Sequence, residues 1–213
     1  MPKPGPAMIT VPRMNYAAVR GHGDPNEEAG DYKTAIGLLY AIAFTVRMSR
    51  KNGHPIDGYF DYVVPPLEGF WRMDERLSAD AVPQNGRHGS ADDIDYAHKE
   101  NFDWISVIRF PDFVTENDFR WAVKEAAKKK KQDFSRAEFL TVEEGLCVQC
   151  LHIGSYDDEP ATAEAMHRFM EDQGYALDLS DQRMHHEIYL SDARKTSPGK
   201  MKTVIRHPVR IRA

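Results

Sequence analysis

The chain has 213 residues, 41% of them hydrophobic, and a net charge of −5, which is typical of a globular protein and not of a general nucleic-acid binder with its basic excess. Two cysteines exclude a disulfide scaffold and fit a reducing compartment. Because no apolar signal segment follows the proline-rich start, and the longest apolar run (35–46) is too short to cross a bilayer, we expect a cytoplasmic protein without membrane contact.

The first predicted elements are a strand and a long helix. The apolar stretch 16–20 predicts a strand that enters a turn at 21–25. Apolar residues at three- and four-residue spacing then predict a helix that begins at 26 or 31 and ends at 51, where Asn52-Gly53 is a good stop signal.

The next segments predict a second strand and a long insertion. The alternating aromatic and β-branched stretch 59–64 predicts a strand, which Pro65-Pro66 should end because proline cannot donate to a sheet ladder. The stretch 73–101 is polar and aperiodic, so it predicts a long loop or insertion. Loops of that length often serve function.

The middle of the chain predicts a strand at 102–110 and a helix at 115–131. Thr115 and Asp118 have the spacing of a capping box at the start of that helix. The lysines at 128–131 suit the carboxyl end of the helix dipole, so we interpret them as a solvated helix end and not as a nucleic-acid site.

The last part of the chain repeats this order of elements. A strand at 146–153 precedes a helix that starts near Pro160 and ends at Gly174. Strands at 186–190 and 202–206 follow.

Two segments with matching residues indicate an internal duplication. Residues 107–111 and 204–208 agree at four of five positions. We also align 61–64 with 187–190. More residues separate these two segments than separate the first pair, and an insertion at 73–101 accounts for the difference. The sequence therefore predicts an α+β fold of two strand–helix–strand–strand units with antiparallel sheets. In a single domain over 1–213, the pseudo-repeats would span about 13–113 and 140–210, joined by helix 115–131. The cleft between them would suit a small molecule.

The cysteines form a C-x-x-C that we interpret as structural. Cys147 and Cys150 lie within a predicted strand, where residues three apart point to opposite faces. They therefore cannot meet on one metal ion or at a helix start, and we expect two small buried side chains. No nucleotide-binding loop, serine elbow or H-E-x-x-H is present, and we predict neither a metal nor a cofactor.

Glu187 is the main candidate for chemistry. Strand alternation places it on the same face as His185 and Tyr189. That face is either simply solvated or it presents a carboxylate inside an aromatic pocket. In a pocket, the carboxylate could pair with a cationic ligand or act in acid–base chemistry.

Aromatic residues could supply the walls of such a pocket. Trp71 follows the segment 65–70, Trp104 opens the next predicted strand, and Tyr156 lies at a strand-to-turn junction. Aromatic walls bind planar or cationic guests by stacking and cation–π attraction, although any single one of these residues is more often part of a core. Glu68 could cap a turn or face the same cavity.

Four separated segments, 65–71, 103–113, 149–159 and 186–192, resemble stand-alone GyrI-like (gyrase-inhibitor-like) small-molecule-binding proteins. The resemblance runs from about residue 13 to the C-terminus. It implies the duplicated fold with a ligand cleft between the halves. Relatives include effector-binding domains of multidrug-sensing regulators, in which a strand glutamate meets cationic drugs, and Glu187 stands at that position.

The resemblance also implies a possible reaction. One subfamily hydrolyses cyclopropanoid DNA-alkylating compounds with an aromatic cage, for which Trp71, Trp104, Tyr156 and Tyr189 are the candidates. Arg72 departs from many relatives, which carry a second aromatic residue there.

The leading hypothesis is a xenobiotic-binding protein that takes a planar aromatic or cationic small molecule and hydrolyses strained electrophiles. One alternative is a sensing or sequestering module without turnover, and another is a protein-interaction modulator of the gyrase-inhibitor type whose partner is unknown. The predicted catalytic residues are Glu187 and Tyr156, and the predicted ligand contacts are Trp71, Trp104, Tyr189, Tyr40, Glu68 and His152.

Overall fold

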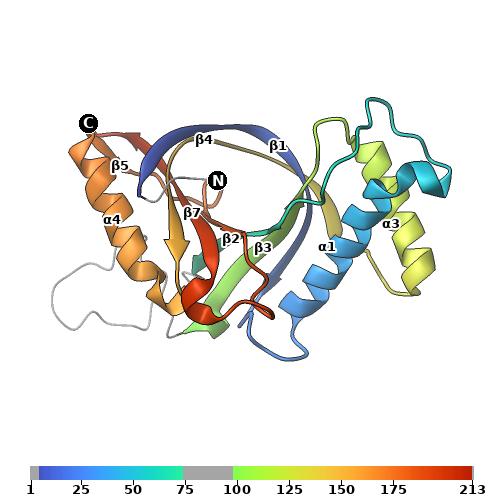
Figure 1. Ribbon diagram of the computed structural model, residues 1–213, viewed down its shortest axis with the longest axis horizontal. Helices are drawn as coiled ribbons and strands as arrows, with labels where there is room; N and C mark the ends of the chain where they lie inside the picture. Colours follow the sequence, from blue (N-terminus) through green and yellow to red (C-terminus); the bar gives the residue numbers. More distant parts are fainter. Residues whose placement is uncertain (1–4, 74–97, 213) are drawn as a thin grey trace.

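The computed structural model describes residues 5–73 and 98–212, so most of the predicted insertion at 73–101 lies outside the described residues. Within these residues, seven antiparallel strands and three helices form a mixed α+β fold (Figure 1). The strands are β1 (Ala7–His22), β2 (Leu67–Met73), β3 (Phe102–Arg109), β4 (Ala137–Ile153), β5 (Tyr175–Leu177), β6 (His185–Tyr189) and β7 (Lys202–Ile211). The helices are α1 (Asp31–Arg47), α3 (Glu116–Lys130) and α4 (Glu159–Asp172), and short 3-10 turns lie at Ser49–Asn52, Lys99–Asn101, Tyr156–Asp158 and Pro198–Lys200.

Six of the strands close into a ring. The order is β4-β1-β3-β2-β6-β7, and β7 pairs again with β4, while β5 pairs with the end of β7. The order strand–helix–strand–strand occurs twice, first as β1-α1-β2-β3 and then as β4-α4-β6-β7 with β5 added. The α+β fold class predicted from the sequence is thereby confirmed, whereas the boundaries of the two pseudo-repeats stay a prediction.

The helices pack on the outside of the ring (Figure 1). On one side α1 covers β1 and β3, and α3 packs against α1 and β4. On the other side α4 covers β4 and β5. The capping box predicted at the start of α3 is present, because Asp118 accepts from the Thr115 backbone N–H and Thr115 accepts from that of Asp118. In the described part of the chain, no helix has the length and apolarity to cross a membrane.

The interior of the ring combines apolar side chains with a buried ionic cluster. His186 stacks on Phe70 with ring centroids 4.1 Å apart. Its Nδ1 lies 3.0 Å from the carboxylate of Glu144, and its Nε2 lies 3.0 Å from the carboxylate of Glu68. Arg206 completes the cluster at 2.5 Å from Glu144. The apolar neighbours are Tyr16, Ala18, Phe70, Ile105, Val107 and Met184.

The strand predicted at 59–64 is wrong. This segment has no regular structure, and the strand β2 begins after Pro65-Pro66 instead of ending there. The physical reason is competition for backbone carbonyls: Arg47 donates to the carbonyl of Tyr62, and Arg50 donates to that of Tyr59. These side chains, one at the end of α1 and one in the 3-10 turn after it, hold the segment as a loop. The alignment of 61–64 with 187–190 is therefore also wrong, and β2 is the counterpart of β6.

The two cysteines are buried and free, as predicted. Cys150 lies in the core under α4, whereas Cys147 is not part of that core. Burial, followed by the nearby charge of Glu144, raises the pKa of the Cys147 thiol to about 12. A thiol that is protonated at neutral pH is a poor nucleophile and metal ligand.

Candidate functional site

A cavity of about 860 Å³ lies over β2 and β6, between α1 and the turn that contains Tyr156. This volume is within the range of small-molecule sites, about 300–1,000 Å³. The wall is mostly apolar, with a buried carboxylate, Glu187, among the lining residues. The aromatic residues of the wall are Tyr32, Tyr40, Trp71, Phe102, Tyr156 and Tyr189.

The register of β2 and β6 places the central residues of the cavity side by side. Gly69 pairs with Glu187, and Trp71 pairs with His185, so all four positions share one face. A Cβ on Gly69 would lie 2.5 Å from Trp71 Nε1 and 3.0 Å from the Tyr189 hydroxyl. Because glycine leaves this space open, the Trp71 indole N–H can donate to the Tyr189 oxygen at 2.9 Å.

Glu187 is surrounded by groups that hold or share a proton. Its Oε1 lies 2.9 Å from His185 Nε2, and both side chains are buried. Burial, followed by the charge of Glu187, raises the pKa of Tyr189 well above its ordinary value. Burial, followed by the charges of Glu187 and Glu159, raises the pKa of Tyr156 to about 12. Both phenols are therefore protonated at neutral pH and can donate hydrogen bonds into the cavity.

The aromatic rings of the wall hold each other in place. Tyr156 meets Tyr189 edge to face with centroids 5.8 Å apart, and Tyr32 packs on Trp71 at 5.4 Å. Such contacts fix ring orientation and add about 0.5–1.5 kcal/mol each. The result is a preformed aromatic surface for a planar guest.

Five of the predicted site residues come together at this cavity, namely Glu187, Tyr156, Trp71, Tyr189 and Tyr40. Their roles as catalytic or binding residues stay predictions. The remaining three, Glu68, Trp104 and His152, lie elsewhere.

Glu68 and Trp104 do not line the cavity. Strand alternation turns Glu68 to the other face of β2, and Trp104 lies deeper in the core. Glu68 pairs with Ile188 in the register, so it faces the ring interior, where it bonds to His186. Trp104 is almost fully buried one layer behind the wall, edge to face with Tyr32 at 5.1 Å. It fills the space over Gly21, where a Cβ would lie 2.2 Å from the indole ring.

His152 has a structural position at the end of β4. Its Nδ1 lies 2.8 Å from the Thr162 hydroxyl and its Nε2 lies 2.9 Å from the Ser155 carbonyl oxygen. These bonds tie the strand to the start of α4, and they use both ring nitrogens, so the histidine has none left for a ligand.

Sequence reasoning missed Tyr32 and Phe102 in the wall and gave His185 no role. Tyr32, Ile36 and Tyr40 are spaced four residues apart on one side of α1, which is a signal that the sequence does contain. His185 was placed on the face of Glu187 by alternation alone. Its hydrogen bond to His207 depends on the pairing of β6 with β7, which no local pattern predicts.

His185, Glu187 and Glu159 also have the side-chain types of a metal site. Their potential ligand atoms all lie within 4.8 Å of one another, and within the described ranges no other group of three does so. The direct hydrogen bond between His185 and Glu187 shows that two of these groups satisfy each other without an ion.

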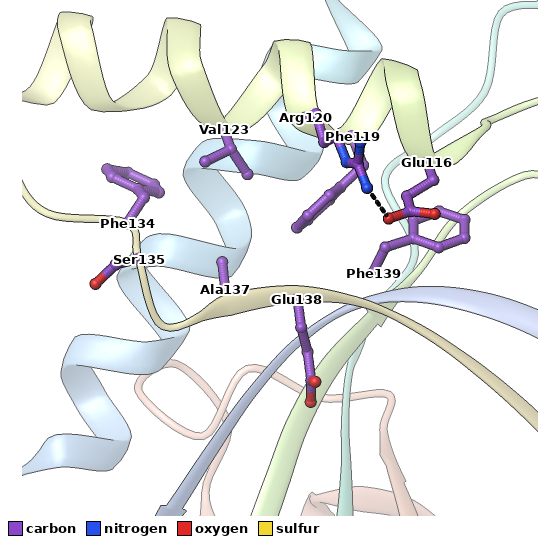
Figure 2. Close-up of a pocket in the computed structure, with 9 residues that line it drawn as sticks. All are labelled: Glu116, Phe119, Arg120, Val123, Phe134, Ser135, Ala137, Glu138 and Phe139. Atoms are coloured by element: carbon purple, nitrogen blue, oxygen red, sulfur yellow. Dashed lines mark hydrogen bonds and ion pairs between the residues drawn. The ribbon is translucent and has the colours of Figure 1, made fainter.

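A second hollow of about 450 Å³ lies between α3 and the beginning of β4 (Figure 2). Phe119, Val123, Phe134 and Phe139 make its apolar floor, and an exposed ion pair of Glu116 with Arg120 lies at α3. It contains none of the predicted site residues and no buried ionisable side chain. The cavity over Glu187 is therefore the candidate site.

Comparison with known proteins identifies the family of the chain. The family model of the GyrI-like small molecule binding domain matches residues 94–210. This chain belongs to the GyrI-like family. A crystal structure of a hydrolase from Listeria innocua is 43% identical with a TM-score of 0.82, covering 99% of this chain and 94% of that one. An uncharacterized conserved protein from Listeria innocua is 44% identical with a TM-score of 0.83, covering 98% and 94%.

The GyrI-like fold extends to more distant proteins. The C-terminal domain of EcmrR is 15% identical with a TM-score of 0.51, covering 97% of each chain, which is a likeness of fold alone. No curated protein matches the chain. The resemblance found in the sequence is thus confirmed, and the protein is a GyrI-like small-molecule-binding domain.

Proposed function

We propose that this GyrI-like protein binds planar aromatic molecules and hydrolyses cyclopropanoid alkylators among them. The observation that carries the proposal is a buried carboxylate, hydrogen-bonded to a buried imidazole, at the wall of an aromatic cavity of about 860 Å³. The 43% identity to a hydrolase from Listeria innocua supports turnover over simple sequestration.

Binding would rest on the aromatic wall and on the charge of Glu187. Trp71 and the tyrosines offer faces and edges on which a fused aromatic guest stacks. A guest with a positive charge gains further attraction from the Glu187 carboxylate and from the ring faces. Planar and cationic character are therefore the two features that the cavity selects.

Hydrolysis would begin with a proton held between Glu187 and His185, called here the Glu187–His185 pair. The pair donates this proton to a guest carbonyl oxygen that is conjugated with the strained ring. The oxygen of a water molecule bonds to a ring carbon, the carbon–carbon bond breaks, and its electrons move to the protonated oxygen, which becomes a phenol. The attacking water then loses one of its two protons to the Glu187–His185 pair, which thereby regains the proton it gave to the guest.

The surroundings favour this proton transfer. The hydroxyls of Tyr156 and Tyr189 lie near Glu187 and stay protonated, so they can stabilise negative charge on the guest. A guest that fills the aromatic cavity excludes bulk water, and fixed donors act more strongly in such a site than in water.

The test is mass spectrometry of a cyclopropanoid alkylator incubated with the protein in ¹⁸O-labelled water. We expect a ring-opened product with one ¹⁸O, formed repeatedly by each protein molecule. Glu187→Gln should slow this reaction at least about 100-fold, as loss of a general acid does, while the exposed Glu143→Gln serves as the matched control at wild-type rate. No product above the buffer control would contradict hydrolysis and leave binding without turnover.

A further inference from the structure

Gly37 is a glycine in the interior of a helix, at a place where the backbone does not require one. It lies inside α1, and its φ is not in the left-handed region that favours glycine. In a helix interior, glycine is the least favourable residue apart from proline. Helix formation therefore gives no reason for a glycine at this position.

Packing within the protein gives no reason for it either. A Cβ added at Gly37 would meet no atom of the surrounding structure within 4 Å, whereas at Gly69 and Gly21 it would lie 2.5 Å and 2.2 Å from an indole ring. Those two glycines make room for tryptophans of this chain. Gly37 lines the cavity over Glu187, so the space that it leaves open belongs to the candidate site.

The position of Gly37 on α1 places it at the mouth of this cavity. The lining residues of α1 are Tyr32, Lys33, Ile36, Gly37 and Tyr40. At about 100° per residue, Tyr32 and Ile36 lie at one edge of this arc, and Lys33 and Gly37 lie at the other. Tyr32 packs on Trp71 of the sheet with ring centroids 5.4 Å apart, so the first edge faces inward. Lys33 and Gly37 are exposed, so the second edge forms the rim.

We propose that Gly37 is a notch in the rim of the cavity, over which the outer ring of a wide, fused polycyclic guest extends while its inner end meets Glu187. The inference rests on the planar-guest binding proposed above, and it names the class of guest that this site prefers. Lys33 lies one turn before Gly37 and places a positive charge at the notch. The outer end of the guest is therefore neutral or electron-rich, and its cationic centre belongs at Glu187.

A side chain at position 37 would close the notch from the α1 side. Side chains of an α-helix tilt toward its N-terminus, so this one would lie over the turn that contains Lys33. An alanine methyl group would take a little of the open space, and a leucine side chain would take most of it. A narrow guest that stays against Trp71 and Glu187 would not meet either. Substitution should therefore separate guests by width and not weaken all of them alike.

The test is calorimetric titration with 4-aminoquinoline and 9-aminoacridine. Both molecules are planar cations at neutral pH with the same aminopyridine core, and the acridine has one further fused ring. We expect Gly37→Leu to lower the affinity for 9-aminoacridine about 10-fold, and Gly37→Ala about 3-fold, as overpacking of a close contact does. The affinity for 4-aminoquinoline should stay at the wild-type value in both variants. The measured quantity is the ratio of the two affinities, which cancels any change in the amount of folded protein.

Two controls exclude a general effect on α1. Gly37→Ala should raise the midpoint of urea unfolding, because alanine is the better helix former. A variant that gains stability and loses affinity for the wide guest cannot owe that loss to a folding defect. Thr34→Leu adds apolar bulk at an exposed position of the same helix that does not line the cavity, so both affinities should stay at wild type.

The outcomes separate this inference from the proposed function. An equal loss for both probes, or an unchanged or tighter 9-aminoacridine complex in Gly37→Leu, would overturn the notch while planar-guest binding stands. If the wild type binds neither probe, planar-guest binding fails and the notch fails with it. Absence of product in the ¹⁸O experiment would contradict hydrolysis alone, because neither probe has to react.

Discussion

His185 and His186 are neighbours on β6, and they point to opposite faces of the same strand. Each lies within 3.0 Å of a glutamate. His186 is fully enclosed in the ring between two carboxylates and against Phe70. His185 is buried behind Glu187, which lines the cavity, and its other ring nitrogen contacts His207. The comparison teaches that two neighbouring histidines of one strand differ chiefly in what their second ring nitrogen contacts, which is Glu68 for His186 and His207 for His185.

The two environments also differ in charge balance. Inside the ring, Glu68 and Glu144 face Arg206 and His186, so a protonated His186 makes the cluster neutral. Burial opposes a charge on His186, but Glu144 and Glu68 outweigh it and raise the pKa of His186. The cluster is enclosed inside the ring, whereas Glu187 of the Glu187–His185 pair lines the cavity.

The largest expected effect is on stability when His186 is removed. His186→Leu leaves two buried carboxylates with a single cation, and breaking a buried pair in this way costs about 3–5 kcal/mol. His185→Leu should cost less than half of that in urea unfolding but abolish turnover. Equal loss of stability in the two variants would contradict the division between structural and functional faces. If His186→Leu does not fold, His186→Gln provides the same comparison at lower cost.

A smaller loss of stability is expected from substitution of Gly69, which leaves room for Trp71 and Tyr189 at the cavity. Gly69→Ala places a methyl group against Trp71 and the Tyr189 hydroxyl, and overpacking of this kind costs about 1–3 kcal/mol. We expect guest affinity to fall about 10-fold as Trp71 moves, measured by fluorescence titration. Gly199→Ala is the control, because a Cβ there meets open space. Unchanged affinity in Gly69→Ala would show that Trp71 does not position the guest.

Much of this functional face could be predicted from the sequence, because alternation in β6 is a local property. It placed Glu187, His185 and Tyr189 together, and the resemblance added Trp71 and Tyr156. The order of elements also came from local patterns such as the capping box at Thr115. These features need no knowledge of which strands pair.

The errors arose where the outcome depends on strand pairing. Glu68 belongs to β2, but the segment 59–64 was taken as the strand, so the face of Glu68 was unknown. The loop at 59–64 forms because side chains at the end of α1 bind its carbonyls, an interaction over 9 to 15 positions of sequence. Likewise, the contact of His185 with His207 needs β7 beside β6, which only the folded ring provides.

The smallest expected effect is the pH dependence of stability that the interior cluster confers. The raised pKa of His186 stabilises the folded state fully below the unfolded value of about 6.5, and this contribution is lost as pH rises through the folded value. Burial would raise the pKa of Glu144, but His186 and Arg206 lower it, so its contribution is present above an unfolded value of about 4.3 and is lost as pH falls through the folded one.

Urea unfolding from pH 4 to 9 should therefore show a maximum between these two limits. Glu144→Gln should flatten both sides of the maximum, because the variant removes one titrating group and the main partner of the other. His185→Gln should leave the profile unchanged in shape, since its pair lies outside the ring. A profile that responds to His185→Gln as strongly as to Glu144→Gln would mean that the two faces of β6 titrate as one network, and the separation between the structural and the functional histidine would not hold.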